Sequence, residues 1–220
     1  MPRSELLGSA RIPDTTKDLL LYKHQDKFSI VIPGRGELMN SRVHGSEIAL
    51  AELACGAMES SARPRLLVGG LGMGFTLAAA LGQVGEGAEV VVAELVPEVV
   101  AWNRDLMGEP SGHPLKDPRS TVFEGDIAAL LRDPGTGFDA IMMDVQLPDM
   151  SGLEITDLIR KGAFGPVNPK IFIAAMTAFA LPEDRRKCLD AGCNDYISKP
   201  VETPKLKRTL ARAANELKQR

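Results

Sequence analysis

Short apolar runs alternate with amphipathic segments along most of this chain, from residue 65 onward. Six of these runs contain consecutive apolar, β-branched or aromatic residues and are bounded by glycines, prolines or acids, so each predicts a strand. The runs cover 65–70, 88–95, 121–126, 138–145, 170–177 and 195–200. Apolar strands that alternate with helices indicate an α/β fold, in which a single doubly wound parallel sheet is covered on both faces.

Apolar positions at helical spacing lie between these runs and predict the covering helices. The expected helices cover 47–58, 74–83, 97–107, 127–133, 151–162, 181–192 and 203–218. Their ends carry ordinary signals, such as Pro97 in a first turn and Gly192 at a last turn.

The first part of the chain lacks this alternation. Residues 1–18 are polar, so we expect a flexible N-terminal lead without the apolar core of a signal peptide. The stretch "FSIVIPGRG" within 27–41 predicts a strand or a hairpin. No apolar run approaches the roughly 18 residues that a transmembrane helix needs.

Composition narrows the class of protein. The 220 residues are 44% hydrophobic and 25% charged, as is typical of a globular protein with a sizeable core. A net charge of −3 provides no basic field for nucleic acid. The three cysteines form no C-x-x-C pair, which favours free thiols in a reducing compartment. We expect a cytoplasmic protein that binds neither nucleic acid nor membrane, and the sequence leaves its oligomeric state open.

Residues suited to chemistry fall at the ends of the predicted strands. They are Gly69–Gly74, Glu94, Asp126, Asp144, Thr177 and Lys199. The carboxyl ends of parallel strands meet at one edge of the sheet, where such folds bind their ligands. A single acid at a strand end is weak evidence, and the shared location carries the argument.

The stretch "VGGLGMGF" (68–75) joins a strand to a helix through a glycine-rich turn. Glycines permit a tight turn and let a ligand approach the backbone closely. Glu94 ends the next strand, where a carboxylate can accept hydrogen bonds from ribose hydroxyls. Asp126 ends the third strand, where an acid can accept a hydrogen bond from an adenine amino group. The predicted nucleoside site comprises Gly69, Gly70, Gly72, Gly74, Glu94 and Asp126.

Five blocks carry a first resemblance: "VHGSEIALAELA", "RLLVGGLGMGFTLAAAL", "VVVAELVPEVVAWNRD", "DPRSTVFEGDIAALL" and "FDAIMMDV". Through them, residues from about 20 to 145 resemble the spermidine synthase family, a branch of the Rossmann-like methyltransferase fold. The resemblance implies binding of S-adenosylmethionine or its decarboxylated form. It places Glu94 on the ribose, Asp126 near the adenine and Asp144 near an attacking amine.

Three blocks carry a second resemblance: "MMDVQLPDMSG", "AAMTA" and "YISKP", in this order. Through them, residues from about 139 to 214 resemble the CheY-like receiver domain of response regulators. The resemblance implies that Asp144 is phosphorylated in a phosphorelay by a phosphodonor kinase, with Thr177 as the switch hydroxyl and Lys199 paired with the phosphate. An aspartyl phosphate needs such a cation and hydroxyl to stabilise its oxygens.

The chain departs from both families. Leu71 and Met73 stand in a glycine motif that usually contains an acid. Receivers hold Mg²⁺ with an acidic pair after their first strand, where this chain has Gly69 and Gly70. Asp144 and a backbone carbonyl alone predict a weak Mg²⁺ site.

The two resemblances meet in "FDAIMMDV", which predicts a chimera. We expect a spermidine-synthase-like half over 19–137 and a receiver-like half over 138–220 that share one sheet. This sheet would be a hybrid of Rossmann-like and flavodoxin-like folds with strand order 3-2-1-4-5-6.

Three functions follow from the chimera. The first is a phosphorelay receiver joined to a nucleoside-binding half and impaired in Mg²⁺-dependent phosphorylation. The second is an aminopropyltransferase or methyltransferase with a damaged second-substrate site. The third is a recombined or designed chimera with a stable fold and no evolved activity. We favour the first because its motifs are the most specific.

Overall fold

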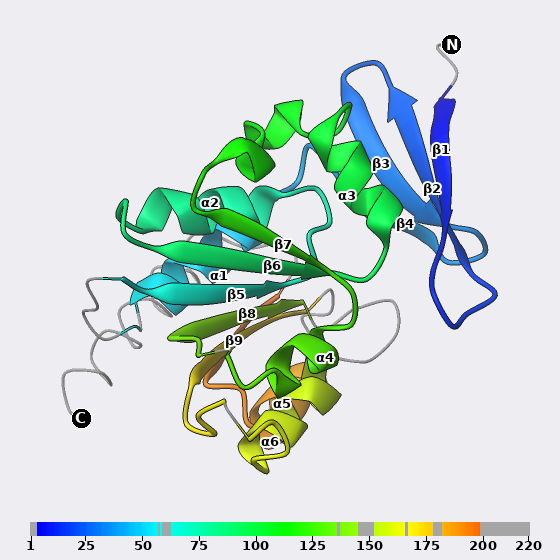
Figure 1. Cartoon of the computed structure of the whole chain (residues 1–220). Helices are drawn as coiled ribbons and strands as arrows, with labels where there is room; N and C mark the ends of the chain where they lie inside the picture. The colour runs from blue at the N-terminus through cyan, green and yellow to red at the C-terminus, as the bar shows by residue number, and fades with distance from the viewer. Residues whose placement is uncertain are drawn as a thin grey trace.

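Six strands form one parallel sheet in the computed structural model (Figure 1). The structure describes residues 4–56, 58, 63–135, 137–144, 152–165, 167–177 and 182–198. The sheet has the order β7-β6-β5-β8-β9-β10, and each neighbouring pair is parallel. Its strands are β5 (Arg65–Gly69), β6 (Glu89–Glu94), β7 (Ser120–Glu124), β8 (Ala140–Asp144), β9 (Phe172–Thr177) and β10 (Asp195–Ser198). In chain order this is the predicted 3-2-1-4-5-6, which is confirmed.

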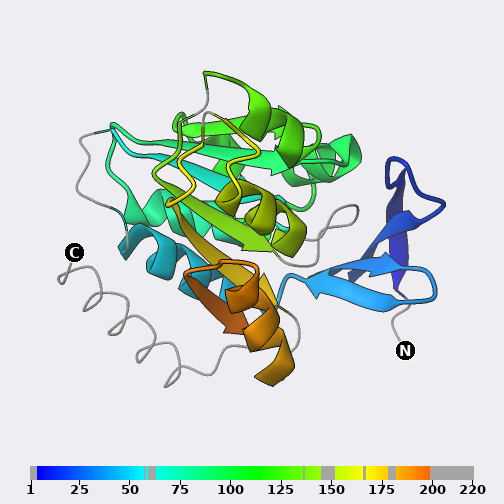
Figure 2. The ribbon, with the colours of Figure 1, turned by 90° about the horizontal axis from the view of Figure 1, so that it is seen from below.

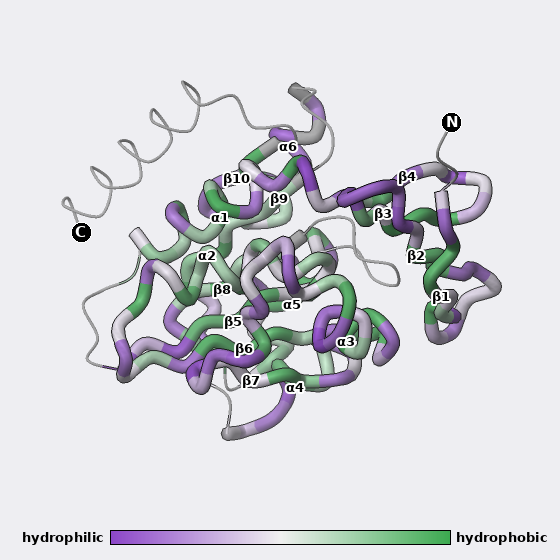
Figure 3. The backbone as a smooth tube through the Cα atoms, turned by 90° about the horizontal axis from the view of Figure 1, so that it is seen from above, coloured by the Kyte–Doolittle hydropathy of each residue, from purple (hydrophilic) through white to green (hydrophobic). Residues whose placement is uncertain are grey.

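Helices cover both faces of this sheet. They are α1 (Gly45–Gly56), α2 (Phe75–Gln83), α3 (Pro97–Arg104), α4 (Ile127–Arg132), α5 (Gly152–Arg160) and α6 (Pro182–Asp190), with two short 3₁₀ turns, η1 (Glu109–Ser111) and η2 (Pro114–Lys116). Successive strand residues alternate between the faces: Leu66 and Val68 pack in the core with α1, α2 and α3, whereas Leu67 packs in the core with α4, α5 and α6. Figure 3 shows the resulting hydrophobic stretches along β5 and β6. In the described part of the chain, no helix is long and apolar enough to cross a bilayer.

A second, antiparallel sheet of four strands precedes the parallel one (Figure 2). It contains β1 (Glu5–Arg11), β2 (Asp18–His24), β3 (Lys27–Ile32) and β4 (Gly36–Asn40). The expectation of a single sheet is therefore wrong, and so is that of a flexible lead over 1–18, because β1 lies within it. These strands bury alternate positions on one face only, and β1 fully buries just Ala10, so its sequence pattern is weak.

The antiparallel sheet packs against α3 through one close contact. A Cβ atom added to Gly8 of β1 would lie 2.8 Å from Nε1 of Trp102. The absence of a side chain at Gly8 therefore makes room for the indole of Trp102. Leu19 and Ile30 belong to the same buried core as Leu66, so the two sheets share apolar contacts.

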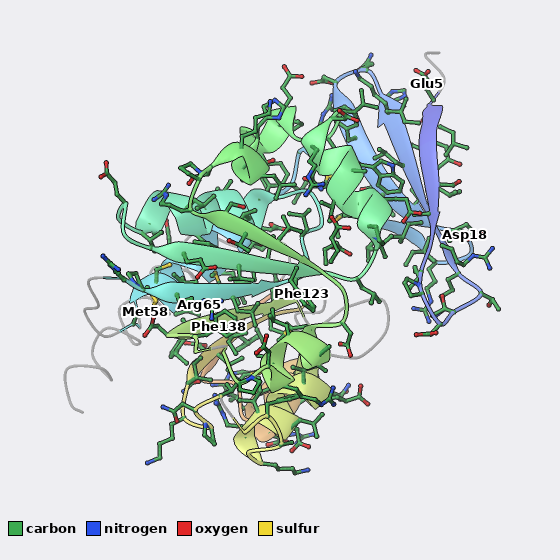
Figure 4. All side chains as sticks on the ribbon, viewed as in Figure 1. Glu5, Asp18, Met58, Arg65, Phe123 and Phe138 are labelled. Carbon is green, nitrogen blue, oxygen red and sulfur yellow. The ribbon has the colours of Figure 1, made fainter. Side chains whose placement is uncertain are left out.

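Charged contacts tie together the starts of three strands at the predicted seam between the halves. The Arg65 guanidinium lies 5.0 Å from the ring centre of Phe138 and 2.8 Å from a carboxylate oxygen of Glu89 (Figure 4). The backbone N–H of Arg65 also donates to Asp139 over 2.7 Å. These contacts help hold β8 beside β5. Both strands lie at the centre of the sheet, and the predicted seam between the halves therefore lies there too.

Candidate functional site

The carboxyl ends of β8, β9 and β10 lie next to one another. Asp144 of β8 is in register with Met176 of β9, and Thr177 of β9 is in register with Ser198 of β10. The sequence-predicted phosphoacceptor and switch positions thus end neighbouring strands. The side chains of Asp144 and Thr177, and the whole of Lys199, lie outside the described part of the structure. The backbone bears out the expected adjacency, and the roles of these residues remain predictions.

A tight turn follows β5, as the glycines predict. Gly70, Gly72 and Gly74 have φ of 91°, 54° and 78°, which L side chains rarely adopt. A Cβ atom at Gly72 would lie 2.9 Å from Sδ of Met39, and one at Gly74 would lie 3.1 Å from Oδ1 of Asn103. The turn is therefore packed between β4 and α3 as well as being conformationally restricted.

Glu94 is buried beneath this turn, with 6% of its surface exposed. Its two carboxylate oxygens accept hydrogen bonds from the backbone N–H groups of Leu71, over 2.9 Å, and Val96, over 3.0 Å. Burial raises the pKa of Glu94, although backbone hydrogen bonds partly oppose the shift. The contact with ribose predicted for Glu94 remains a prediction. The carboxylate of Glu94 already occupies one backbone donor of the turn, the N–H of Leu71.

Asp126 has a local role that the sequence analysis did not foresee. It is the N-cap of α4, and its Oδ1 accepts a hydrogen bond from the backbone N–H of Ala128 over 2.8 Å. Its neighbours Gly125 and Ile127 line the pocket described below, whereas Asp126 does not. The adenine contact proposed for Asp126 therefore has no direct support in the geometry and stays a prediction.

Asn103 is a residue of this site that the sequence analysis did not name. It is buried in α3, and its Nδ2 donates to the backbone oxygens of Gly72, over 2.8 Å, and Val99, over 2.9 Å. Asn103 therefore links the glycine turn to α3 and stabilises it. A signal was present in the sequence, because Asn103 is a polar residue four positions after Val99 on the buried face of the helix.

A pocket opens between the two sheets at this edge. It contains about 1010 Å³ of empty space, including space open to solvent. Its walls come from β2, β3, β4 and α1, from the glycine turn, and from the ends of β5, β6, β8 and β9. Glu94 lines it, together with the thioethers of Met39, Met73, Met142 and Met176. Met142 and Met176 come from the receiver-like half, so the pocket is built from both halves.

The described residues contain no cluster of three or more His, Cys, Asp or Glu side chains that could hold a metal ion. Gly69 is in register with Met143, so the end of β5 does lie beside the end of β8. The position that would need acids for a Mg²⁺ site beside Asp144 is therefore occupied by Gly69 and Gly70. The weak Mg²⁺ site at Asp144 remains a prediction.

Comparison with known proteins relates the back half of the chain to a known domain family. Residues 124–211 match the family described as the response regulator receiver domain, a match that begins upstream of the expected residue 139, at the end of β7. The polar-differentiation response regulator DivK of Brucella anthropi is 36% identical over 107 residues, which cover 49% of this chain and 80% of DivK. Hybrid signal transduction histidine kinase L of Dictyostelium discoideum is 37% identical over 84 residues, which cover 38% of this chain and 5% of the kinase. The chain thus spans only a small part of some relatives.

The fold of the whole chain is similar to that of a solved enzyme. Spermidine synthase from Thermotoga maritima superposes with a TM-score of 0.56 over 96% of this chain and 64% of the enzyme. The sequence identity is 15%, so the likeness concerns the fold alone.

Proposed function

This chain belongs to the response regulator receiver family, and we propose on that premise that Asp144 accepts a phosphoryl group in a phosphorelay. The observation that carries the proposal is the register of β8, β9 and β10, with Asp144 and Thr177 at the ends of neighbouring strands. The family match spans this whole edge, including Lys199. A histidine kinase is the proposed phosphodonor, because several similar sequences belong to proteins named as histidine kinases.

The proposed chemistry uses three groups. A carboxylate oxygen of Asp144 attacks the phosphorus atom of the donor, and the bond from phosphorus to the donor breaks. The Thr177 hydroxyl donates to a phosphoryl oxygen and Lys199 neutralises its charge. A metal ion would supply further positive charge. Because Gly69 and Gly70 stand where acids would hold it, we expect phosphorylation to be slow.

Incubation with acetyl phosphate and Mg²⁺, followed by intact-mass analysis, tests this proposal. We expect slow labelling that is lost in Asp144→Asn and kept in Asp126→Asn, a matched acid at the same edge. Circular dichroism verifies that both variants are folded. Labelling that persists in Asp144→Asn would assign the reaction to another residue.

We propose as a second function that the pocket binds an adenosyl nucleoside, either S-adenosylmethionine or its decarboxylated form. The observation that favours it is the buried Glu94 carboxylate beside a glycine turn, both of which line the pocket. Glu94 and the turn would hold the nucleoside, which supplies a methyl or aminopropyl group for transfer. Asp144 would stand near an accepting amine, as the family resemblance implies.

Titration calorimetry with both ligands tests the second proposal. We expect Glu94→Ala to weaken binding by about 1.5–3 kcal/mol, because it removes charged hydrogen bonds to the ribose. Glu124→Ala changes the acid in register with Glu94 on β7 and should bind like the parent protein. Absence of binding by the parent protein at millimolar ligand would contradict the proposal. If labelling of Asp144 also fails, a chimera without evolved activity is left.

A further inference from the structure

We propose that the pocket controls Asp144 electrostatically: a positively charged nucleoside bound there accelerates phosphorylation of Asp144. This inference rests on both functions proposed above. Its basis is that the pocket reaches from the glycine turn of the front half to the strand ends of the receiver-like half.

Two methionines bring the pocket close to Asp144. Met142 lines the pocket and precedes Asp144 by two residues on β8, which corresponds to about 7 Å along a strand. Met176 also lines the pocket and is the register partner of Asp144 on β9, at the usual separation of about 5 Å between strands. Both methionines are buried, with 0% and 3% of their surfaces exposed. A ligand against them would lie within about 10 Å of the Asp144 backbone.

The charges of the pocket walls favour a cation. Among the described residues that line the pocket, the charged ones are Glu47 and Glu94, and both are acids. The four methionines add polarizable thioether surface without charge. A positive ligand would therefore be attracted by Glu94 and by Asp144 together. At an effective dielectric constant near 20, unit charges about 8 Å apart change an equilibrium by roughly tenfold or more.

The positive charge of the bound ligand would also favour phosphorylation of Asp144. In the reaction with an acyl phosphate, an Asp144 oxygen forms a bond to phosphorus, the bond from phosphorus to the acyl oxygen breaks, and a carboxylate leaves. Asp144 thereby exchanges a carboxylate for a more negative acyl phosphate, which nearby positive charge stabilises. The place for metal-binding acids is taken by Gly69 and Gly70, so a cation in the pocket would partly supply the missing charge.

Three related ligands separate charge from shape. At neutral pH, decarboxylated S-adenosylmethionine carries two net positive charges, S-adenosylmethionine carries one, and methylthioadenosine carries none. Calorimetry of the parent protein and of Asp144→Asn gives a readout that does not depend on phosphorylation. We expect Asp144→Asn to weaken binding of the decarboxylated form by about tenfold and of S-adenosylmethionine by less. Binding of methylthioadenosine should not change, and Glu124→Gln should leave all three affinities unchanged.

Labelling by acetyl phosphate provides the second readout. The initial rate should rise several-fold with saturating decarboxylated ligand, less with S-adenosylmethionine, and not with methylthioadenosine. The inference would be overturned if Asp144→Asn weakened the binding of all three ligands equally, or if the labelling rate did not depend on the charge of the ligand. Either result would leave the nucleoside-binding proposal intact. Failure of all three ligands to bind would overturn the nucleoside proposal and the inference together. A charge-dependent effect of Asp144→Asn on binding, without labelling under any condition, would overturn the phosphoacceptor proposal and the control of phosphorylation.

Discussion

The two halves of the parallel sheet have ionic anchors at opposite ends of the strands, a buried carboxylate in the front half and a half-buried guanidinium in the back half. In the front half, Glu94 stands at the carboxyl end of β6 and accepts backbone hydrogen bonds from Leu71 of the glycine turn and from Val96. In the back half, Arg160 ends α5 and donates to the backbone oxygens of Gly192, Pro169 and Ile171, over 2.7–2.9 Å. It also donates to Oδ1 of Asn194, just before β10.

In the back half, the residue that stabilises the fold lies away from the candidate site, whereas in the front half one residue belongs to both. The hydrogen bonds of Arg160 lie at the amino ends of β9 and β10, away from the carboxyl ends at which Asp144 and Thr177 stand. Glu94 lies at the edge where a ligand would bind, so it supports the fold and lines the candidate site at once. Substitution of Arg160 should therefore change stability alone, whereas substitution of Glu94 should change both stability and ligand binding.

The strongest test of the front anchor is Glu94→Ala. It leaves the backbone N–H groups of Leu71 and Val96 without their buried acceptor, and we expect the free energy of unfolding to fall by about 2–4 kcal/mol. Urea denaturation measures the change. The matched control is Glu124→Ala, which removes the exposed acid in register with Glu94 and should cost below about 0.5 kcal/mol. Equal effects of the two substitutions would show that the buried hydrogen bonds of Glu94 contribute little.

The corresponding test in the back half is Arg160→Met, which keeps the apolar stem and removes the guanidinium. We expect a loss of about 2–3 kcal/mol, because several backbone oxygens lose a charged donor. The exposed neighbour Lys161, paired with Asp157 over 2.6 Å, provides the control, and Lys161→Met should cost below about 0.5 kcal/mol. Labelling of folded Arg160→Met by acetyl phosphate should match the parent protein. A large fall in labelling would contradict the separation of roles.

Two glycines with similar backbone angles sharpen the comparison further. Gly74 and Gly162 have φ of 78° and 71°, so alanine is strained at both. A Cβ atom at Gly74 would lie 3.0–3.1 Å from Ser111, Asn103 and Pro114, whereas one at Gly162 has its nearest neighbour at 3.9 Å. We expect Gly162→Ala to cost about 1 kcal/mol and Gly74→Ala about 2 kcal/mol, measured by thermal unfolding. Equal costs would mean that crowding does not restrict the front turn.

The smallest expected effect is on the pH dependence of stability. The pKa of Glu94 is raised by burial from its usual 4.5, so above pH 4.5 the folded state holds a proton that the unfolded state releases. The stabilisation from this proton is complete below pH 4.5 and is lost as the pH rises through the folded-state pKa. The parent protein should therefore lose more stability than Glu94→Gln over this range, in urea denaturation at stepped pH. A Glu124→Gln variant should follow the parent protein, and parallel curves for all three proteins would refute the shift.

The parallel sheet could be predicted because its inner strands are apolar on both faces. Runs such as Val90–Val92 have no polar alternation, so their burial and their order relative to the helices are visible in the sequence. The hairpin expected within 27–41 is confirmed as β3 and β4. The other two strands of the antiparallel sheet, β1 and β2, were missed because they are buried on one face and are interrupted by polar residues. Pairing between β1 and β2 depends on neighbours across the ladder, which a local pattern does not reveal.

The sequence predicted where the residues of the candidate site lie, but it did not predict most of their hydrogen bonds. Strand ends located Glu94 and Asp144, because topology alone brings those positions to one edge. The hydrogen bonds of Glu94 to Leu71 and Val96 depend on turn geometry, and so does the bracing of the turn by Asn103. The capping of α4 by Asp126 is a local signal that the expected adenine contact obscured.

The central place of β8 limits how the receiver-like segment can be transplanted. Ala140, Ile141, Met142 and Met143 are completely buried, and their backbone pairs with β5 on one side and β9 on the other. A fragment beginning at residue 138 would expose the β5-facing edge of this apolar strand, which invites pairing with other chains and aggregation. A fragment that begins at residue 124, where the family match begins, includes only the end of β7, and β6 and β5 separate β7 from β8 in this sheet. The two halves carry distinct sequence patterns, but because β8 pairs with strands of both, we expect neither half to fold stably without the other.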